Sequence, residues 1–223
     1  MLLLAWMWFS PEVQVLYSHF SFLSCHSNSG AMRTVVIGDS MVRRVAARKV
    51  QLAGGGFTMY FGEGGAKIGG LREMTIRNLS RRRMPTTLII HIGTNDIFLD
   101  SIGAIRYRIE ENVMSVRKLL PHKRIIWSNI LPHAIYLKKN QESKGAGKRC
   151  TLNLNKFAHN LCMKIPNMRY IQHQNFSFTD RSLFYWDSVH LSDKGYKLLL
   201  ANWSNGLVFL NAHSDALGYS PCP

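Results

Sequence analysis

The stretch Thr34-Val35-Val36-Ile37-Gly38-Asp39-Ser40 decides the fold of this chain. Its first four residues predict a strand that is buried on both faces, as strands of a parallel sheet are. A helical pattern follows over 41–51, with Val42, Val45 and Ala46 on one face. A strand that passes through a tight turn into a helix is typical of an α/β unit. The turn residues then lie at the end of the sheet where such folds collect their chemistry.

The same alternation continues along the chain. Further strands are predicted over 57–61, 87–92, 124–127 and 169–172, and further helices over 71–79, 102–120 and 154–163. Ser192 is a good N-cap for a last helix. The segment 132–149 is polar and basic without a period, and we expect a long loop there. Five strands alternating with helices predict a parallel sheet covered on both faces, with right-handed crossovers.

The 223 residues suffice for one domain, which we place over 32–210. Residues 1–31 are expected to be a disordered extension and 211–223 a tail. The apolar start, residues 1–9, is too short to span a bilayer and lacks the basic flank of a secretory signal, and a weak signal peptide is the alternative for it.

The composition combines an ordinary hydrophobic share with an unusual charge. Hydrophobic residues make up 46% of the chain, which supports a real core, whereas the formal net charge is +15. Such a charge indicates an acidic partner, namely nucleic acid, an anionic membrane surface or an anionic substrate. A solvated basic surface without a specific partner is the alternative. No aromatic platform alternates with the basic clusters, as it would in a protein that binds single strands.

The cysteines indicate neither a metal site nor a redox site. Cys25, Cys150, Cys162 and Cys222 form no CxxC pair and no zinc spacing. We therefore expect neither a zinc knuckle nor a redox motif, and a reducing, intracellular compartment as the default.

Ser40 is the candidate nucleophile, because it stands at the entrance to a helix directly after a strand. A serine hydroxyl needs a base at hydrogen-bond distance to become reactive. Taken alone, Gly-Asp-Ser is more often a plain turn in which Ser40 or Asp39 caps the helix.

His190 and Asp187 are the candidate base and orienting acid. His190 would take the proton of Ser40 and return it to the leaving group. Asp187, three residues earlier, could accept a hydrogen bond from the other imidazole nitrogen and fix the tautomer. A capped surface loop or a pair of metal ligands are the alternatives, and too few other ligands stand nearby to favour the metal.

Donors for an oxyanion are expected from three places. Asn95, in Gly93-Thr94-Asn95-Asp96 at a strand end, offers a side-chain amide. The Gly64-Gly65 pair could add a backbone N–H, since glycine allows close approach, and the Ser40 N–H completes the set. Asx hydrogen bonds for Asn95 and Asp96, and simple flexibility for the glycines, are the alternatives.

Together these blocks resemble the SGNH hydrolase superfamily, also called GDSL-type esterases and lipases. The resemblance covers 33–210 and rests on Ser40 in IGDSMV, Gly65 in GEGGAKIGG, Asn95 in IGTNDI and His190 in DSVHLSDKGY. It implies a three-layer α/β/α, flavodoxin-like fold with a parallel five-stranded sheet. It also implies cofactor-free hydrolysis of lipid or small-molecule esters through an acyl-enzyme, with Asp39 and Asp96 shaping their loops.

The sequence departs from that family pattern at two places. Met41 stands where the family has leucine, and the glycine block is irregular, so Gly64 and Gly65 both stay candidates. The run Val42-Arg43-Arg44-Val45 resembles SGNH-like domains encoded by vertebrate retrotransposons. The competing hypothesis is accordingly a catalytically silent module of that origin, which binds nucleic acid or anionic membrane through its basic surface.

Overall fold

The computed structural model describes residues 32–80, 82–97, 100–132, 141–177 and 179–213. The expected extension over 1–31 lies outside the described residues, as do 133–140 and residues 214–223 of the expected tail. Within the described part of the chain, no helix is long and apolar enough to cross a membrane.

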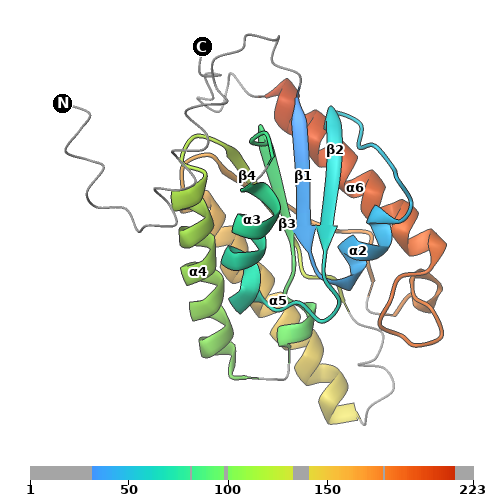
Figure 1. The fold of residues 1–223 in the computed structure, drawn as a ribbon. Helices are drawn as coiled ribbons and strands as arrows, with labels where there is room; N and C mark the ends of the chain where they lie inside the picture. Colours follow the sequence, from blue (N-terminus) through green and yellow to red (C-terminus); the bar gives the residue numbers. More distant parts are fainter. Residues whose placement is uncertain (1–31, 81, 98–99, 133–140, 178, 214–223) are drawn as a thin grey trace.

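A five-stranded sheet forms the centre of the molecule (Figure 1). Its strands are β1 (Arg33–Gly38), β2 (Phe57–Gly62), β3 (Thr87–His91), β4 (Arg124–Ser128) and β5 (Met168–Ile171). Their order is β2-β1-β3-β4-β5, and every neighbouring pair is parallel. The parallel five-stranded sheet predicted from the sequence is therefore confirmed.

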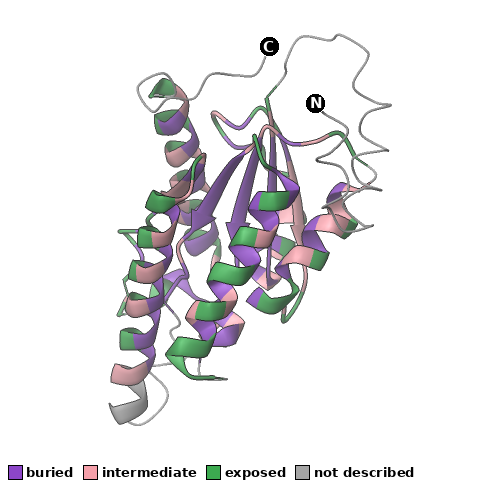
Figure 2. Cartoon of the chain, turned by 90° about the vertical axis from the view of Figure 1, so that its left-hand side faces the viewer, coloured by how far each residue is buried: buried purple, intermediate pink, exposed green. Residues whose placement is uncertain are grey.

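Two helical layers cover this sheet because alternate strand residues point to opposite faces. Val35, Leu88 and Ile125 pack with α3 (Leu71–Leu79), α4 (Ile102–Leu119) and α5 (Gln141–Lys164). Val36, Ile89 and Ile126 pack with α2 (Ser40–Ala46) and α6 (Asp193–Ala212). The strands are buried between the layers, and the outward faces of the helices are exposed (Figure 2). This is the predicted three-layer α/β/α architecture.

The prediction of a loop over 132–149 is wrong for residues 141–149, which belong to α5. The buried positions Gly147, Cys150 and Leu154 recur at helical spacing. Gly147 is buried but gives no apolar signal in the sequence, so the helical period is hidden. The first helix is instead shorter than predicted and ends at Ala46, since Lys49 takes a φ of +51° that no α-helix can contain.

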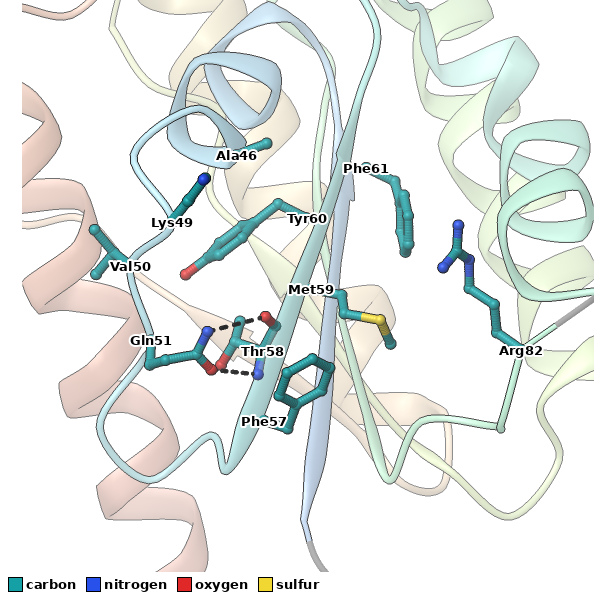
Figure 3. Close-up of a pocket in the computed structure, with 10 residues that line it drawn as sticks. All are labelled: Ala46, Lys49, Val50, Gln51, Phe57, Thr58, Met59, Tyr60, Phe61 and Arg82. Atoms are coloured by element: carbon teal, nitrogen blue, oxygen red, sulfur yellow. Dashed lines mark hydrogen bonds between the residues drawn. The ribbon is translucent and has the colours of Figure 1, made fainter.

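The free edge of the sheet at β2 is partly covered by a side chain. The Gln51 carboxamide oxygen accepts from the Thr58 amide at 2.7 Å, and its nitrogen donates to the Thr58 carbonyl at 3.4 Å (Figure 3). The Gln51 side chain thus forms the two backbone hydrogen bonds with Thr58 that a neighbouring strand would form. A hollow of about 290 Å³ flanks the same edge and holds none of the predicted catalytic residues. Covering an edge in this way discourages pairing with other chains.

Candidate active site

The turn that carries Ser40 is fixed by a close approach of two strands. A Cβ on Gly38 would lie 1.9 Å from the carbonyl oxygen of His91, so only glycine fits where β1 ends against β3. The Asp39 amide donates to that same carbonyl at 3.3 Å. Asp39 then caps α2 by accepting from the Met41 amide at 2.9 Å. Ser40, half-buried, is the first residue of α2 and follows the carboxyl end of β1 directly.

Asp39 is a buried acid, with 1% of its surface exposed. Burial raises its pKa to about 7, against hydrogen bonds from the Met41 amide and the Thr94 hydroxyl that lower it. The nearby Asp96 carboxylate adds a further raising effect. The capping bond confirms the expectation that Asp39 shapes its loop. Of the two capping residues considered from the sequence, Asp39 rather than Ser40 is the N-cap of α2.

The glycine loop and the Asn95 turn lie side by side at the ends of β2 and β3. Asn95 donates its side-chain amide to the carbonyl of Ala66 at 2.9 Å. Asp96 accepts from the Ile68 amide at 3.1 Å, which ties the same loop a second time. Gly65 has a φ of +72°, and no atom lies within 4 Å of the place that a Cβ would take, so the side-chain position of this residue is open. The structure thus brings Asn95 beside Gly65, while one amide hydrogen of Asn95 is already engaged.

Asp187 and His190 form the only hydrogen-bonded pair of carboxylate and imidazole within the described residues. The distance from Asp187 Oδ2 to His190 Nδ1 is 2.6 Å. The other carboxylate oxygen accepts from the amides of Val189 and His190, each at 2.9 Å. Burial opposes ionisation of Asp187, but the His190 side chain and these amides outweigh it and lower the pKa to about 2. Asp187 is therefore ionised at neutral pH and holds the Nδ1–H of His190.

A short closed turn presents this pair at the surface. The Tyr185 amide donates to the carbonyl of His190 at 2.8 Å, and the Ser188 amide donates to the carbonyl of Tyr185 at 2.9 Å. Ser188 has a φ of +60°, and Trp186 at the turn is 89% exposed. The side chains of His190 and Asp187 are 22% and 28% exposed, so solvent and a small ligand can reach them.

The serine turn and the histidine turn are joined through the core rather than through their polar atoms. Met41, next to Ser40, and Leu191, next to His190, are buried in one apolar cluster below the two turns. Figure 1 shows α2 and the loop before α6 at the same end of the sheet. Within the described part of the chain, no hydrogen bond links Ser40 to His190. The structure thus brings Asp187 together with His190, and Asn95 together with the glycine loop. It does not bring Ser40 into hydrogen-bond contact with His190.

A second serine–histidine constellation, which the sequence did not predict, is buried in the core. Ser128 Oγ lies 2.9 Å from His91 Nδ1, 2.8 Å from His173 Nε2 and 2.8 Å from the indole nitrogen of Trp203. Asn202 contacts the remaining nitrogen of His173 at 3.1 Å. Because the indole only donates and the hydroxyl has one proton, one imidazole donates to Ser128 and the other accepts. These residues come from three strand ends and α6, and no spacing in the sequence connects them.

This buried cluster lacks the features of a catalytic centre. Ser128 is fully buried, and His91 and His173 are 1% and 5% exposed, so no ester can reach the hydroxyl. Burial lowers the pKa of His91 to about 3 and that of His173 well below its usual value, and the partner of His173 is an amide rather than a carboxylate. The cluster is a neutral hydrogen-bonded network that ties β3, β4 and α6 together.

Among the described residues, no three His, Cys, Asp or Glu side chains are grouped so that they could hold a metal ion. Cys150 and Cys162 are buried free thiols, and burial raises the pKa of both.

The fold and this arrangement define the class: an α/β/α domain with polar groups gathered at the carboxyl edge of its parallel sheet. The model of the GDSL-like lipase/acylhydrolase family matches residues 23–203, and the chain belongs to that family. The resemblance drawn from the sequence blocks is thereby confirmed. None of the curated proteins is similar enough to match the chain.

Proteins of solved structure are similar to this chain, and the first two below share its fold. A Streptococcus pneumonia protein provisionally described as a platelet activating factor is 21% identical, with 88% of this chain and 91% of that chain covered and a TM-score of 0.62. A carbohydrate esterase of family 3 from Talaromyces cellulolyticus is 14% identical, with 80% and 98% covered and a TM-score of 0.57. The esterase domain of the zebrafish ZfL2-1 retrotransposon ORF1 protein is 28% identical over 79% of this chain and 99% of that domain, with a TM-score of 0.41.

Membership of this family defines the general class of reaction. The chain is an ester-hydrolysing enzyme of the GDSL-like lipase/acylhydrolase class, and its substrates are small-molecule esters.

Proposed function

We propose that this protein cleaves carboxylic esters by a serine mechanism in which Ser40 is the nucleophile, His190 the base and Asp187 the orienting acid. The bond of 2.6 Å between Asp187 and His190 is the observation that carries the proposal. An imidazole whose Nδ1–H is held by a carboxylate presents an unprotonated Nε2, which is the atom that must accept a proton.

The proposed reaction has two halves. Ser40 Oγ attacks the ester carbonyl while His190 Nε2 takes the hydroxyl proton, and the negative charge on the carbonyl oxygen is met by N–H donors. The imidazolium returns the proton to the leaving alcohol, which leaves an acyl group on Ser40. A water molecule then loses a proton to His190 and attacks the acyl group, and the proton passes back to Ser40 as the acid departs.

The oxyanion donors are the amides of Ser40 and Gly65 and the side chain of Asn95. One hydrogen of the Asn95 amide holds the glycine loop through Ala66, and the second remains for the substrate. Gly65 is favoured over Gly64, because the position of Gly65 is open whereas Gly64 lies under the Arg43 side chain. No hydrogen bond joins Ser40 to His190 among the described residues, and in many free enzymes the catalytic hydrogen bonds form or shorten only when substrate binds.

Hydrolysis of p-nitrophenyl acetate and butyrate tests the proposal. The wild-type protein should release p-nitrophenol, and Ser40→Ala and His190→Ala should each lower kcat by about 10³-fold or more, because a triad acts as a unit. Ser80→Ala is the matched control, since Ser80 is the C-cap of α3 and belongs to neither of the two proposed catalytic turns. Turnover that survives in Ser40→Ala removes the serine from the mechanism.

We also infer a second candidate role from the charge, namely binding of nucleic acid or anionic membrane. Arg48, Arg72, Arg77 and Arg108 pair with local carboxylates, but 28 basic residues against 13 acidic ones leave a large excess. Filter binding with RNA and DNA at several salt concentrations tests this role, because phosphate contacts weaken steeply with salt. Absence of binding near physiological salt contradicts the nucleic-acid role, and sedimentation with phosphatidylserine vesicles tests the membrane in the same way.

A further inference from the structure

An arginine side chain lies over the glycine loop beside the proposed nucleophile. A Cβ built on Gly64 would lie 3.2 Å from Arg43 Nη1, 3.3 Å from Cζ and 3.4 Å from Nη2. These similar distances place the guanidinium flat against Gly64, one residue before the proposed oxyanion donor Gly65. Gly62 shows why the helix can come so close, because a Cβ there would lie 2.0 Å from the backbone nitrogen of Arg43.

The position of Arg43 on α2 points it to the same side as Ser40. The two residues are three apart in the helix, and such residues are neighbours on one helix face, with their Cβ atoms about 5–6 Å apart. Helical side chains also lean toward the N-terminus of their helix, which here is Ser40. The guanidinium therefore lies against the glycine loop, on the side of α2 that also carries the proposed nucleophile.

Arg43 has no anionic partner within the described part of the chain, and the carboxylates around it are engaged elsewhere. Glu63, which precedes Gly64, pairs with Arg77. Asp187 holds His190, and Asp96 accepts from the Ile68 amide. The exposed Arg43 guanidinium thus offers its donors to whatever binds at the site.

Burial opposes the ionisation of two acids near the nucleophile, Asp39 and Asp96. Burial raises the pKa of Asp39 to about 7 and raises that of Asp96 as well. Lys67 and the ion pair of Arg108 with Asp100 also lie near enough to Asp96 to act on its charge. The Arg43 cation against the glycine loop therefore attracts an anionic substrate and raises its local concentration.

We propose that Arg43 makes the enzyme selective for esters that carry an anionic group, a carboxylate or a phosphate, close to the scissile bond. The guanidinium can hold either oxyanion through two parallel N–H bonds, a geometry that a lysine cannot reproduce. This inference rests on the proposed function, because it assigns the substrate class of that same site.

Paired esters that differ only in charge test the inference. One pair is 3-acetoxybenzoate against 3-acetoxybenzamide, and the other is the acetyl ester of glycerol 3-phosphate against monoacetylglycerol. The measured quantity is the ratio of kcat/KM between the anionic and the neutral member. The two pairs distinguish a carboxylate from a phosphate as the recognised group.

The wild-type ratio should exceed 1 in at least one pair and should fall about tenfold in Arg43→Gln, as expected for one charge-assisted contact at an exposed position. Arg43→Lys should keep part of the ratio, and raising the salt to about 0.5 M should reduce the wild-type ratio through screening. Arg83→Gln is the matched control, because this exposed arginine precedes β3 at the opposite end of the sheet. Its ratio should equal that of the wild type.

The outcomes separate this inference from the proposed function. Hydrolysis of both members with the same ratio in wild type and Arg43→Gln overturns the inference and leaves the serine mechanism standing. Failure to hydrolyse any of the four esters overturns the proposed function and the inference together. Circular dichroism and the Arg43→Lys variant exclude misfolding as the reason for a lost ratio.

Discussion

At the scale of single residues, the account depends on which nitrogen of His190 is free to take a proton. The carboxylate of Asp187 holds Nδ1 at 2.6 Å and is itself fixed by two backbone amides, so turning the imidazole breaks its bond to a fixed acceptor. Asp187→Asn keeps the shape of the turn but removes the charge that stabilises the imidazolium. We expect kcat for p-nitrophenyl butyrate to fall by about 100-fold or more. A variant that retains wild-type kcat would show that Asp187 only shapes the turn.

Asp39 gives a second prediction at the same scale, on stability against pH. Its folded pKa of about 7 lies above the unfolded value of 3.8, so the folded state keeps this proton to higher pH. The protonated acid contributes its full stability below pH 3.8, and that contribution is lost as the pH rises toward 7. Asn at this position accepts the same Met41 bond without titrating.

As the pH rises from about 4 to 7, the unfolding free energy of Asp39→Asn should therefore increase relative to that of the wild type, by up to about 1.4 kcal/mol per pH unit. Urea titrations across this range of pH measure the difference between the two proteins. A difference that stays constant contradicts the burial of a protonated Asp39.

At the scale of elements, the close approach of the neighbouring strands β1 and β3 sets the position of the nucleophile. Gly38→Ala would drive a methyl group against the His91 carbonyl at 1.9 Å and also against Val42, so the strands must separate. We expect a loss of about 3 kcal/mol or more of unfolding free energy, together with a loss of esterase activity. Gly70→Ala is the matched control, since nothing lies within 4 Å of its Cβ and its φ is −93°. Equal stability of the two variants would contradict the close strand approach.

At the scale of the whole molecule, the buried Ser128 network predicts how the fold responds to acid. His91 and His173 have folded pKa values below the unfolded value of 6.5, so the unfolded chain binds protons that the folded chain refuses. Their contribution to stability is present above pH 6.5 and is lost as the pH falls toward 3. His91→Gln, which cannot protonate, should show a shallower loss of stability than the wild type when the pH falls from 6.5 to about 4. If the unfolding free energy falls equally steeply with pH in both proteins over this range, His91 is not a neutral, buried residue.

The architecture of this molecule can be predicted from its sequence, whereas many of its long-range contacts cannot. Strong apolar runs such as 87–92 predict the strands, and Ser192 predicts the start of α6, because both signals are local. The early part of α5 escapes prediction since Gly147 hides its buried face. The partners of Ser128 come from separate strands and a helix, and such long-range contacts leave no spacing to detect. The sequence also names Ser40 and His190 without fixing the distance between them.

The most direct test of the central claim asks which serine is activated. The protein is treated with a fluorophosphonate probe, digested and read by mass spectrometry. We predict a single modified serine at Ser40, with labelling abolished in His190→Ala and unchanged in Ser80→Ala. Modification of Ser128 in place of Ser40, or labelling of Ser40 that does not depend on His190, would contradict the account.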